Sequence, residues 1–452
     1  MTRTLIEGAH VATVDARDTE YDGGHVLIEG TRILATGPGS APAALREGAT
    51  VIDGRGHLLT PGLVNTHHHL YQWLTRGFAQ DSILFDWLVA LYPAWSRIDA
   101  DLVRDGAAGA LATLAKSGCT TVSDHHYVFP QGGGDIVGGL IEAAGGIGLR
   151  LDVARGSMDL GSSQGGLPPD FAVESLDGAL AGSQWAVETY NDASFDSMVR
   201  IAVAPCSPFS VTSDLLREAA TLARGLGVRL HTHGSETAEE EAFCLERFGQ
   251  KPTDYLEGLG WLGDDVWMAH CVHLDDDSIA RFAATGTGVA HCPSSNGRLA
   301  AGIAPIPELL RAGVPVGLGV DGAASNESGQ LGTELRNSLL VNRLRSGADQ
   351  LSGRQALRMA TYGGAQVLGR TAEIGSIEVG KLADLALWRI DGVEHAGIAD
   401  PVAALTLGGL PTLTRLFVNG EVVVHEGHLA RASEPDIARG VAAASSALAA
   451  RL

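Results

Sequence analysis

Short apolar runs alternate with longer amphipathic stretches through the middle of the chain. We expect the apolar runs to form buried strands near residues 62–66, 119–124, 148–154, 199–204, 227–233, 266–270, 287–291 and 316–321. Stretches with helical spacing, such as residues 101–118 and 213–227, fill the gaps between these runs. Eight strands that alternate with helices are the number that closes a parallel barrel. The pattern therefore predicts an α/β fold in which residues 61–371 form a (β/α)8 TIM-type barrel.

The two ends of the chain have a different pattern. Residues 1–60 contain short alternating apolar and polar runs separated by Gly and Asp turns, which predicts an antiparallel sheet. A similar pattern returns from about residue 375, where Asn419 and Gly420 form a strong hairpin signal. We expect residues 1–60 and 372–452 to form one small β-sandwich domain with a C-terminal helix, and the barrel to be inserted between its two parts.

Two connections between the predicted strands are long. Residues 70–98 concentrate aromatic side chains, although aromatic residues make up only 5% of the chain. Such a segment either covers the mouth of a barrel or packs on its outside or at a subunit interface, and the pattern leaves both open. Residues 156–171 are rich in Gly and Pro, which predicts a loop beside the same rim.

The net charge indicates which partners the protein is able to bind, and the cysteines indicate its cellular compartment. The chain has 32 basic and 53 acidic residues, a formal net charge of -21, which opposes binding to a phosphate backbone. Its five cysteines form no CxxC pair, which favours reduced thiols. We find neither a signal-peptide pattern at the N-terminus nor an apolar run of the roughly 18 residues that a membrane helix needs. We therefore expect a cytoplasmic protein that binds neither nucleic acid nor membranes.

Histidines and one aspartate follow the ends of several predicted strands. They are His67 and His69, His231 and His233, His270, and Asp321. Because the C-terminal ends of parallel barrel strands meet at one rim, we expect these side chains to converge. His67 and His69 face the barrel axis together, since alternate residues of a strand point the same way.

This arrangement predicts a metal site. Two imidazoles on one face suit zinc or another divalent transition metal, to which His233 adds a nitrogen and Asp321 an oxygen. One HxH pair alone is a weak signal, because a buried structural pair is more common than a pair of ligands. The combination at the strand ends of one eightfold pattern is more specific. We predict one divalent ion, Zn²⁺ first and Fe²⁺ as the alternative, held by His67, His69, His233 and Asp321.

The placement of lysines bears on the number of metals. The chain contains only Lys116, Lys251 and Lys381, and none of them follows a predicted strand near this site. This argues against a two-metal centre bridged by a carboxylated lysine and favours a single ion.

Two further groups are candidates for proton transfer. Glu236 follows His233 closely, within reach of water and substrate, where a carboxyl group is able to pass a proton to a ring nitrogen. Its alternative role is a favourable charge at a helix start, which fits Glu239, Glu240 and Glu241 better. His270 is placed to hydrogen-bond the attacking water or a developing oxyanion, with a ligand role still open. Asp321 is also able to take the proton of the water.

With these residues in place, the chain resembles the amidohydrolase superfamily over nearly its full length. The resemblance rests on PGLVNTHHH, HTHGSE, AHCVH, HCPSSN, LGVDGAASN, GSIEVGKLADL and LFVNG. Within the superfamily the chain is similar to the mononuclear aminohydrolases, above all the 8-oxoguanine deaminases, through HHHLYQ, DHHYVFP, FCLERFG, GWLGDDVW and GVAHCPSSNGRLAAGIAP. The s-triazine hydrolases are near in pattern.

The resemblance implies roles for the site residues. The metal would lower the pKa of its water from ~16 toward ~7, and His270 would orient this nucleophile. Asp321 would accept the proton of the water and Glu236 would protonate the ring nitrogen, after which ammonia leaves. No organic cofactor is implied.

Three residues are candidates for substrate contacts. The amide of Gln72 offers a donor and an acceptor, which suits the lactam edge of an oxidised purine, whereas relatives that attack triazines tend to carry an acid near this position. His126 and Cys206 follow the second and fourth barrel strands and are candidate pocket walls, for which a packing role is equally open.

The function implied is metal-dependent hydrolytic deamination of an amino-substituted heteroaromatic ring, with 8-oxoguanine converted to urate and ammonia as the first choice. The alternatives are a guanine, pterin or s-triazine aminohydrolase or chlorohydrolase, or a catalytically silent barrel in an assembly. The expected partner is a small heteroaromatic substrate, and the resemblance implies a homo-oligomer.

Overall fold

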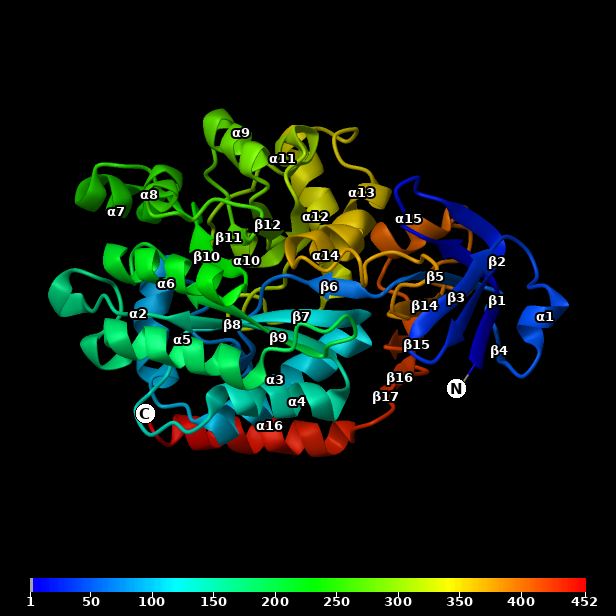
Figure 1. Ribbon diagram of the computed structural model, residues 1–452, viewed down its shortest axis with the longest axis horizontal. Coiled ribbons are helices and arrows are strands. Elements are labelled where there is room, and N and C mark those ends of the chain that lie inside the picture. The colour runs from blue at the N-terminus through cyan, green and yellow to red at the C-terminus, as the bar shows by residue number, and fades with distance from the viewer. Residues whose placement is uncertain (1–2) are drawn as a thin grey trace.

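The central strands close into a parallel barrel, as predicted. The computed structural model describes residues 3–452, so the first two residues of the predicted 1–60 segment lie outside the described residues. The barrel strands are β6 (Leu63–Asn65), β7 (Cys119–His126), β8 (Arg150–Ser157), β9 (Val199–Pro205), β10 (Leu230–Gly234), β11 (Val266–His270), β12 (Gly288–His291) and β13 (Val316–Leu318). β13 pairs with β6 to complete the ring (Figure 1). The predicted fold class and all eight predicted strands are confirmed.

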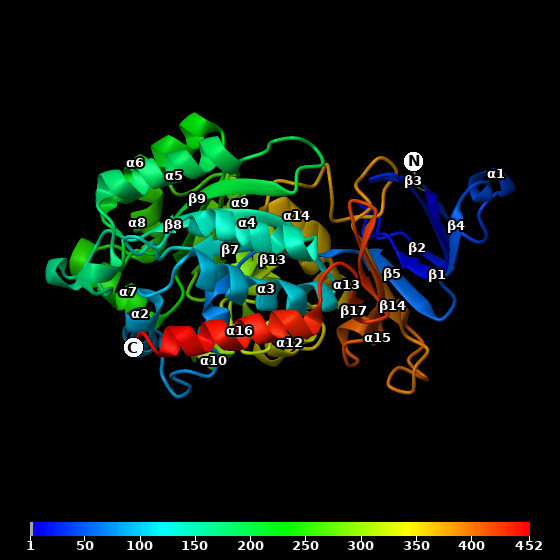
Figure 2. The ribbon, with the colours of Figure 1, turned by 90° about the horizontal axis from the view of Figure 1, so that it is seen from below.

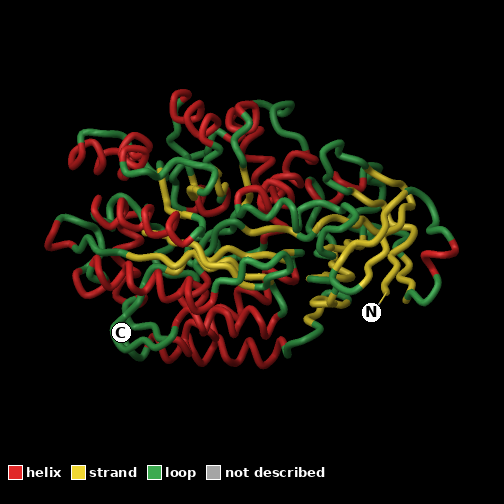
Figure 3. The backbone as a smooth tube through the Cα atoms, viewed as in Figure 1, coloured by secondary structure: helices red, strands yellow, loops and turns green. Residues whose placement is uncertain are grey.

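Helices surround the barrel and begin at capping side chains. Asp99, Ser175 and Thr212, for example, each accept a hydrogen bond from a backbone N–H in the first turn of the helix that follows. The barrel helices are α3 (Ala100–Lys116), α4 (Ile136–Ile147), α5 (Leu176–Tyr190), α6 (Ser213–Leu226), α7 (Ala238–Phe248), α8 (Pro252–Gly258), α9 (Asp276–Thr285), α10 (Pro293–Arg298), α11 (Ile306–Ala312), α12 (Leu331–Ser346), α13 (Gly353–Arg358), the π-helical turn Met359–Gly363 and α14 (Gly364–Val367). Figure 3 shows the barrel strands enclosed by these helices.

The two ends of the chain form one sheet. Its strands are β1 (Arg3–Ala12), β2 (Glu20–Glu29), β3 (Arg32–Gly37), β4 (Thr50–Asp53), β5 (His57–Pro61), β14 (Leu385–Arg389), β15 (Thr412–Val418), β16 (Glu421–His425) and β17 (His428–Leu429), with the short helices α1 (Ala43–Arg46) and α15 (Pro401–Thr406) beside them. The order is β17-β16-β15-β14-β5-β1-β2-β3, with β4 also paired to β1. The N-terminal and C-terminal parts therefore meet where β5 pairs with β14.

The composite domain has one shared core, although its strands are joined in a single hydrogen-bonded sheet. Ile6 and Val26 from the N-terminal part lie in the same buried cluster as Leu387 and Phe417 from the C-terminal part. The two chain ends therefore share one buried core on a single sheet. The predicted hairpin turn lies between β15 and β16, where Asn419 has φ 50° and Gly420 φ 74°.

A buried ion pair ties the small domain to the barrel. Arg150 at the start of β8 donates to Asp384 at 3.2 Å and to the side chain of Asn419 at 2.7 Å. Asp384 also accepts the backbone N–H of Asn419 at 2.8 Å. Because a buried charge is tolerated only when it is paired, this contact fixes the turn between β15 and β16 against the base of β8.

The C-terminal helix α16 (Glu434–Ala449) packs on the barrel rather than on the small domain with which it was grouped in the sequence. Figure 2 shows it lying along α3. Lys116 contacts Glu434 at 2.7 Å. Gly109 allows the close approach, since a Cβ there would lie 2.7 Å from Val441. Leu448 on the buried face of α16 belongs to the same buried core as Leu111 and Leu114 of α3.

The aromatic segment 70–98 covers the mouth of the barrel. It forms the 3-10 helix η1 (Leu70–Thr75) and the helix α2 (Leu84–Trp95). Trp87 is buried and its indole N–H donates to the backbone oxygen of Ala324 at 3.2 Å, at the rim beyond β13. The other long connection is the predicted loop, with the short turns η2 (Ser162–Gln164) and η3 (Asp170–Ala172). Among residues 3–452, no helix combines the length and apolar character that crossing a bilayer requires.

Candidate active site and metal centre

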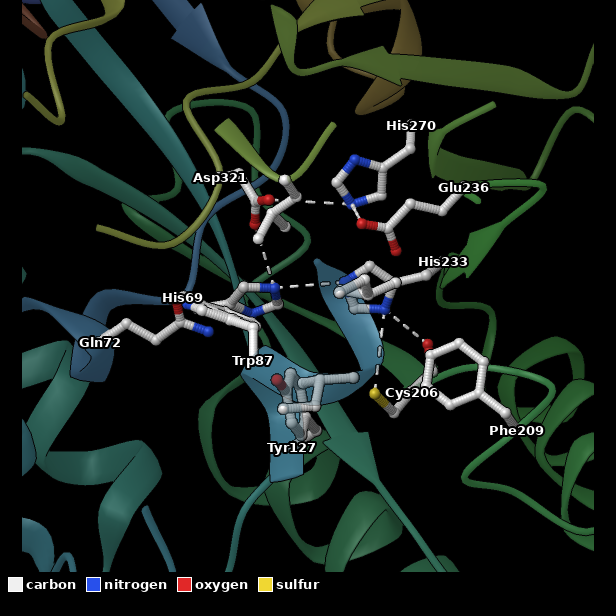
Figure 4. A pocket seen from close by; sticks show the side chains of 13 residues that line it. His69, Gln72, Trp87, Tyr127, Cys206, Phe209, His233, Glu236, His270 and Asp321 are labelled. Carbon is white, nitrogen blue, oxygen red and sulfur yellow. Dashed lines mark hydrogen bonds and ion pairs between the residues drawn. The ribbon is translucent and has the colours of Figure 1, made fainter. Parts of the chain in front are cut away.

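The side chains expected to converge do meet at the C-terminal ends of the barrel strands. His67 and His69 follow β6, His233 lies near the end of β10, and Asp321 follows β13. Figure 4 shows His69, His233 and Asp321 facing one another. Nε2 of His69 lies 3.2 Å from Nε2 of His233, and Oδ1 of Asp321 lies 3.3 Å from Nε2 of both His67 and His69. All four side chains are buried. We call these residues the four-residue cluster.

Backbone carbonyls fix which nitrogen of two of these imidazoles faces inward. Nδ1 of His69 lies 2.5 Å from the oxygen of His125, and Nδ1 of His233 lies 2.7 Å from the oxygen of Cys206. A carbonyl only accepts, so each Nδ1 carries the hydrogen and each Nε2 of the neutral ring presents a lone pair. Two lone pairs 3.2 Å apart repel each other, and a cation between them removes the repulsion.

His231 fixes the third imidazole. Its Nδ1 donates to the oxygen of Trp267 at 3.0 Å, which leaves its Nε2 to accept from Nδ1 of His67 at 2.9 Å. Nε2 of His67 is consequently bare, and it has no hydrogen-bond partner among residues 3–452. Three bare imidazole nitrogens and one carboxylate oxygen are a donor set that fits zinc. The sequence marked His231 only as one half of an HxH pair, and its orienting position was missed.

Burial keeps these groups in the protonation states that a metal requires. It lowers the pKa of His233 to about 3 and lowers the pKa values of His67 and His69 below their ordinary range. Burial alone would raise the pKa of Asp321, but the close approach of His67 at 3.3 Å and the other nearby imidazoles hold it well below its usual value. The cluster therefore presents neutral imidazoles and an ionised carboxylate.

Glu236 and His270 lie next to the cluster. Oε1 of Glu236 is 3.5 Å from Nε2 of His270, which is 3.9 Å from Oδ2 of Asp321. Thr237, not Glu236, caps helix α7, so the side chain of Glu236 is free to point into the site (Figure 4). Burial and the neighbouring carboxylate of Asp321 raise the pKa of Glu236 well above its usual value.

Hydrogen bonds from outside the cluster hold His270 and Asp321 in place. Nδ1 of His270 lies 2.9 Å from the side-chain oxygen of Asn296, and the hydroxyl of Ser295 donates to Asp321 at 2.5 Å. His270 and Asp321 also adopt left-handed backbone conformations, with φ 71° and φ 63°. Such strain persists only where the surroundings over-determine it, which is common at functional sites.

A pocket of about 350 Å³ opens beside the cluster. Its walls are His69, Gln72, Leu84, Trp87, Leu88, Tyr127, Cys206, Phe209, His233, Glu236, His270, Leu299 and Asp321. Gln72, Leu84, Trp87 and Leu88 all come from segment 70–98, so this segment forms one wall. The sequence did not single out Tyr127, although it lies in the segment DHHYVFP, or Phe209 as walls of the pocket.

Of the three candidate substrate contacts, two line the pocket. Both polar atoms of the Gln72 side chain are buried and have no hydrogen-bond partner among the described residues. Cys206 also lines the pocket, and burial raises the pKa of its thiol to about 12, so the thiol is neutral.

His126 is the exception, because it lies outside the pocket lining. Its Nε2 contacts the oxygen of Val128 at 2.8 Å, and its ring packs against Tyr71 and Phe129. Successive residues of a strand point to opposite faces, and on β7 it is His125 that turns toward the cluster, stacked on His233 with ring centroids 4.8 Å apart.

Known proteins resemble this chain along its length. The amidohydrolase family matches residues 58–423. The 8-oxoguanine deaminase of Pseudomonas aeruginosa is 44% identical over 432 residues, covering 94% of this chain and 95% of that protein. An isoxanthopterin deaminase from an unknown prokaryotic organism is 38% identical, covering 93% and 92%. The crystal structure of atrazine chlorohydrolase from Arthrobacter aurescens complexed with zinc superimposes with a TM-score of 0.91 at 35% identity, covering 98% of this chain and 100% of that chain.

Proposed function

This chain belongs to the amidohydrolase family and is a hydrolase that acts on C–N bonds, and from that premise we propose that it converts 8-oxoguanine to urate and ammonia with one bound zinc ion. The observation that carries the proposal is the convergence of three bare imidazole nitrogens and one carboxylate beside a buried carboxyl group, in a pocket with a free amide. The 44% identity to an 8-oxoguanine deaminase supports this choice of ring.

The metal would be held by His67, His69, His233 and Asp321. A divalent ion there supplies Lewis-acid activation, which makes water a nucleophile at neutral pH. Fe²⁺ is the alternative ion, because imidazole also suits iron. The zinc in the related chlorohydrolase structure supports zinc as the first choice.

Three side chains would move protons and orient the reactants. Asp321 would take a proton from the attacking water. His270, held through Nδ1 by Asn296, would use its Nε2 to orient that water. Glu236, whose burial favours the protonated form, would deliver a proton to the ring nitrogen next to the carbon under attack. Asp321 would then pass the proton it took from water to the amino group, and Glu236 would take the proton of the new hydroxyl group, so that ammonia leaves as the carbonyl forms.

Gln72 would select the ring. A lactam edge presents a carbonyl acceptor beside an N–H donor, and the unpartnered amide of Gln72 matches both. Trp87 and Tyr127 provide flat walls for a planar bicycle. A pterin carries a similar edge, so isoxanthopterin is the first competitor.

Ammonia release from 8-oxoguanine, guanine, isoxanthopterin and a chloro-triazine, measured in parallel on zinc-loaded protein, tests the choice of substrate. We expect the highest kcat/KM with 8-oxoguanine. Faster turnover of isoxanthopterin or guanine would transfer the proposal to that ring, and chloride release from the triazine would favour the chlorohydrolase alternative. If none of the four compounds is converted, the result contradicts this proposal and favours the catalytically silent barrel.

Replacing Gln72 by alanine is expected to lower kcat/KM for 8-oxoguanine by ~10- to 100-fold, because substrate polar groups lose buried partners. Gln80→Ala is the matched control, since Gln80 lies in the same segment but is exposed. Steady-state kinetics of both variants provide the comparison. Equal losses, or no loss in the Gln72 variant, would remove Gln72 from substrate recognition.

Replacing His231 by phenylalanine should weaken zinc binding by ~10- to 100-fold, the usual effect of losing a group that orients a ligand. The phenyl ring keeps the packing on Trp267 but offers no acceptor to Nδ1 of His67. Competition with a chromogenic chelator measures the affinity. His126→Phe, a buried change outside the pocket, is the control. Unchanged zinc affinity in the His231 variant would show that His67 needs no such partner.

A homo-oligomer and a cytoplasmic location stay predictions. Light scattering on the purified protein would establish the number of subunits, and fractionation of the source cells would establish the compartment.

A further inference from the structure

A second cavity lies at the opposite end of the barrel, at the N-terminal ends of strands β8 to β11. It has an empty volume of about 880 Å³, including its open mouth. Its walls are Asp152, Asn191, Ala193, Arg200, Ile201, Ala202, Gly227, Val228, Arg229, Trp267, Leu368, Gly369 and Glu373. We call this the base cavity. None of its residues takes part in the reaction proposed above.

Two arginines and two carboxylates line the base cavity, and a third arginine lies behind its wall. Arg370, fully buried behind the wall, donates to Asp152 and to Glu373, each at 2.8 Å. Arg200 donates to the other oxygen of Glu373 at 2.6 Å. Both oxygens of Glu373 and one oxygen of Asp152 are therefore paired with Arg370 and Arg200.

Arg229 is left without an anionic partner. It forms no ion pair within residues 3–452, and its one hydrogen bond goes from Nη2 to the backbone oxygen of Val367 at 2.9 Å. Its Nε is buried without a partner, as is Nε of Arg200. Asp265 acts on Arg229 only at longer range and already pairs with Arg224 at 2.8 Å. Among the described residues that line the cavity, Arg229 is thus the charged side chain without an ion-pair partner.

An unpaired, partly buried guanidinium is costly to maintain, because burial penalises its charge. Burial accordingly lowers the pKa of Arg229 from its ordinary value. A guanidinium presents several N–H donors in a planar fork that matches the two oxygens of a carboxylate or phosphate. The rest of the wall is apolar, with Val228, Leu368 and the ring of Trp267.

We propose that the base cavity binds a small organic anion, with its carboxylate or phosphate group on Arg229 and Arg200 and its apolar part against Trp267. Such a ligand would lie at the opposite end of the barrel from the four-residue cluster. Side-chain contacts through Trp267 and His231 connect the two sites. Trp267 stacks on His231 with ring centroids 4.5 Å apart, and His231 contacts His67 at 2.9 Å. A ligand in the base cavity would therefore contact Trp267, which stacks on His231, the hydrogen-bond partner of His67.

Tryptophan signals distinguish the two cavities in one experiment. The chain has seven tryptophans, of which Trp267 lines the base cavity and Trp87 lines the active-site pocket. Zinc-loaded protein labelled with ¹⁵N-tryptophan is titrated with benzoate in one arm and inorganic phosphate in another, against sodium chloride at matched ionic strength. Trp267→Phe and Trp87→Phe assign the two indole signals. We expect a saturable shift of the Trp267 signal in at least one arm and none with chloride.

Substitution of Arg229 completes the test. Arg229→Gln should raise the dissociation constant by ~10-fold or more, while Arg229→Lys, which keeps the charge but not the fork, should have an intermediate effect. Arg217→Gln, an exposed arginine of α6, is the control. The lysine variant keeps the test valid if the glutamine variant does not fold. A shift of Trp87 in place of Trp267, a response without saturation, or equal affinity in the Arg229 and Arg217 variants would overturn the proposal.

Discussion

Replacing Glu236 by glutamine is expected to lower kcat for ring deamination by ~10²- to 10⁴-fold, the contribution typical of a positioned acid or base, while zinc stays bound. Glutamine has the shape of glutamic acid but has no proton to give to a ring nitrogen. Oε1 of Glu236 lies 3.5 Å from Nε2 of His270, and both residues line the pocket. None of the four residues that would hold the metal is changed by this substitution.

The kinetic and metal measurements must be made on the same preparation. Stopped-time ammonia assays give kcat, and elemental analysis gives the zinc content. Glu246→Gln is the matched control, because Glu246 lies on α7, the helix that follows Glu236, and is exposed. Normal turnover in the Glu236 variant would show that the proton comes from another group. Loss of zinc together with activity would instead assign Glu236 a structural part in the cluster.

Removing the metal is expected to have the largest effect. Protein stripped by a chelator should release no ammonia above the buffer blank, and about one equivalent of zinc should restore the rate. His69→Ala should stay inactive after the same addition, because His69 supplies one of the three bare nitrogens and lies 3.2 Å from His233. Full activity in protein shown by elemental analysis to hold no transition metal would end the metal proposal.

The barrel and the convergence of its strand ends could be predicted because the signals are local. Each strand is a short apolar run, and the position of a residue at the end of a run, such as His233 or Asp321, fixes the rim on which it lies. The composite domain was recognisable for the same reason, since both ends repeat the short alternating pattern.

Other features depend on packing that no single segment encodes. His231 and His233 point the same way from β10, and only the neighbouring carbonyls of Trp267 and Cys206 show how each is held. His126 was a candidate wall because it follows a strand, but the strand presents His125 to the cluster instead. Helix α16 has an apolar face that either domain could cover. Its contacts with α3 place it on the barrel.

Segment 70–98 and the base cavity also depend on packing that no single segment of the sequence encodes. The aromatic residues of segment 70–98 fitted a cover or an outer surface equally well until α2 was placed over the pocket, with Trp87 among its walls. The base cavity is formed by residues at the beginnings of strands, such as Arg200 and Arg229, which follow no motif.

The pairing of β5 with β14 also constrains folding during synthesis. Thr60 accepts a hydrogen bond from the indole of Trp388, 328 positions later in the chain. During synthesis the first strands leave the ribosome long before their partner exists, and β5 waits with one unpaired edge, which is the kind of surface that drives aggregation. Pairing of such distant segments is slow, because a long loop must close first. Leu385 of β14 pairs with Pro61 of β5, so the small domain is completed only after the whole barrel segment between them has been synthesised.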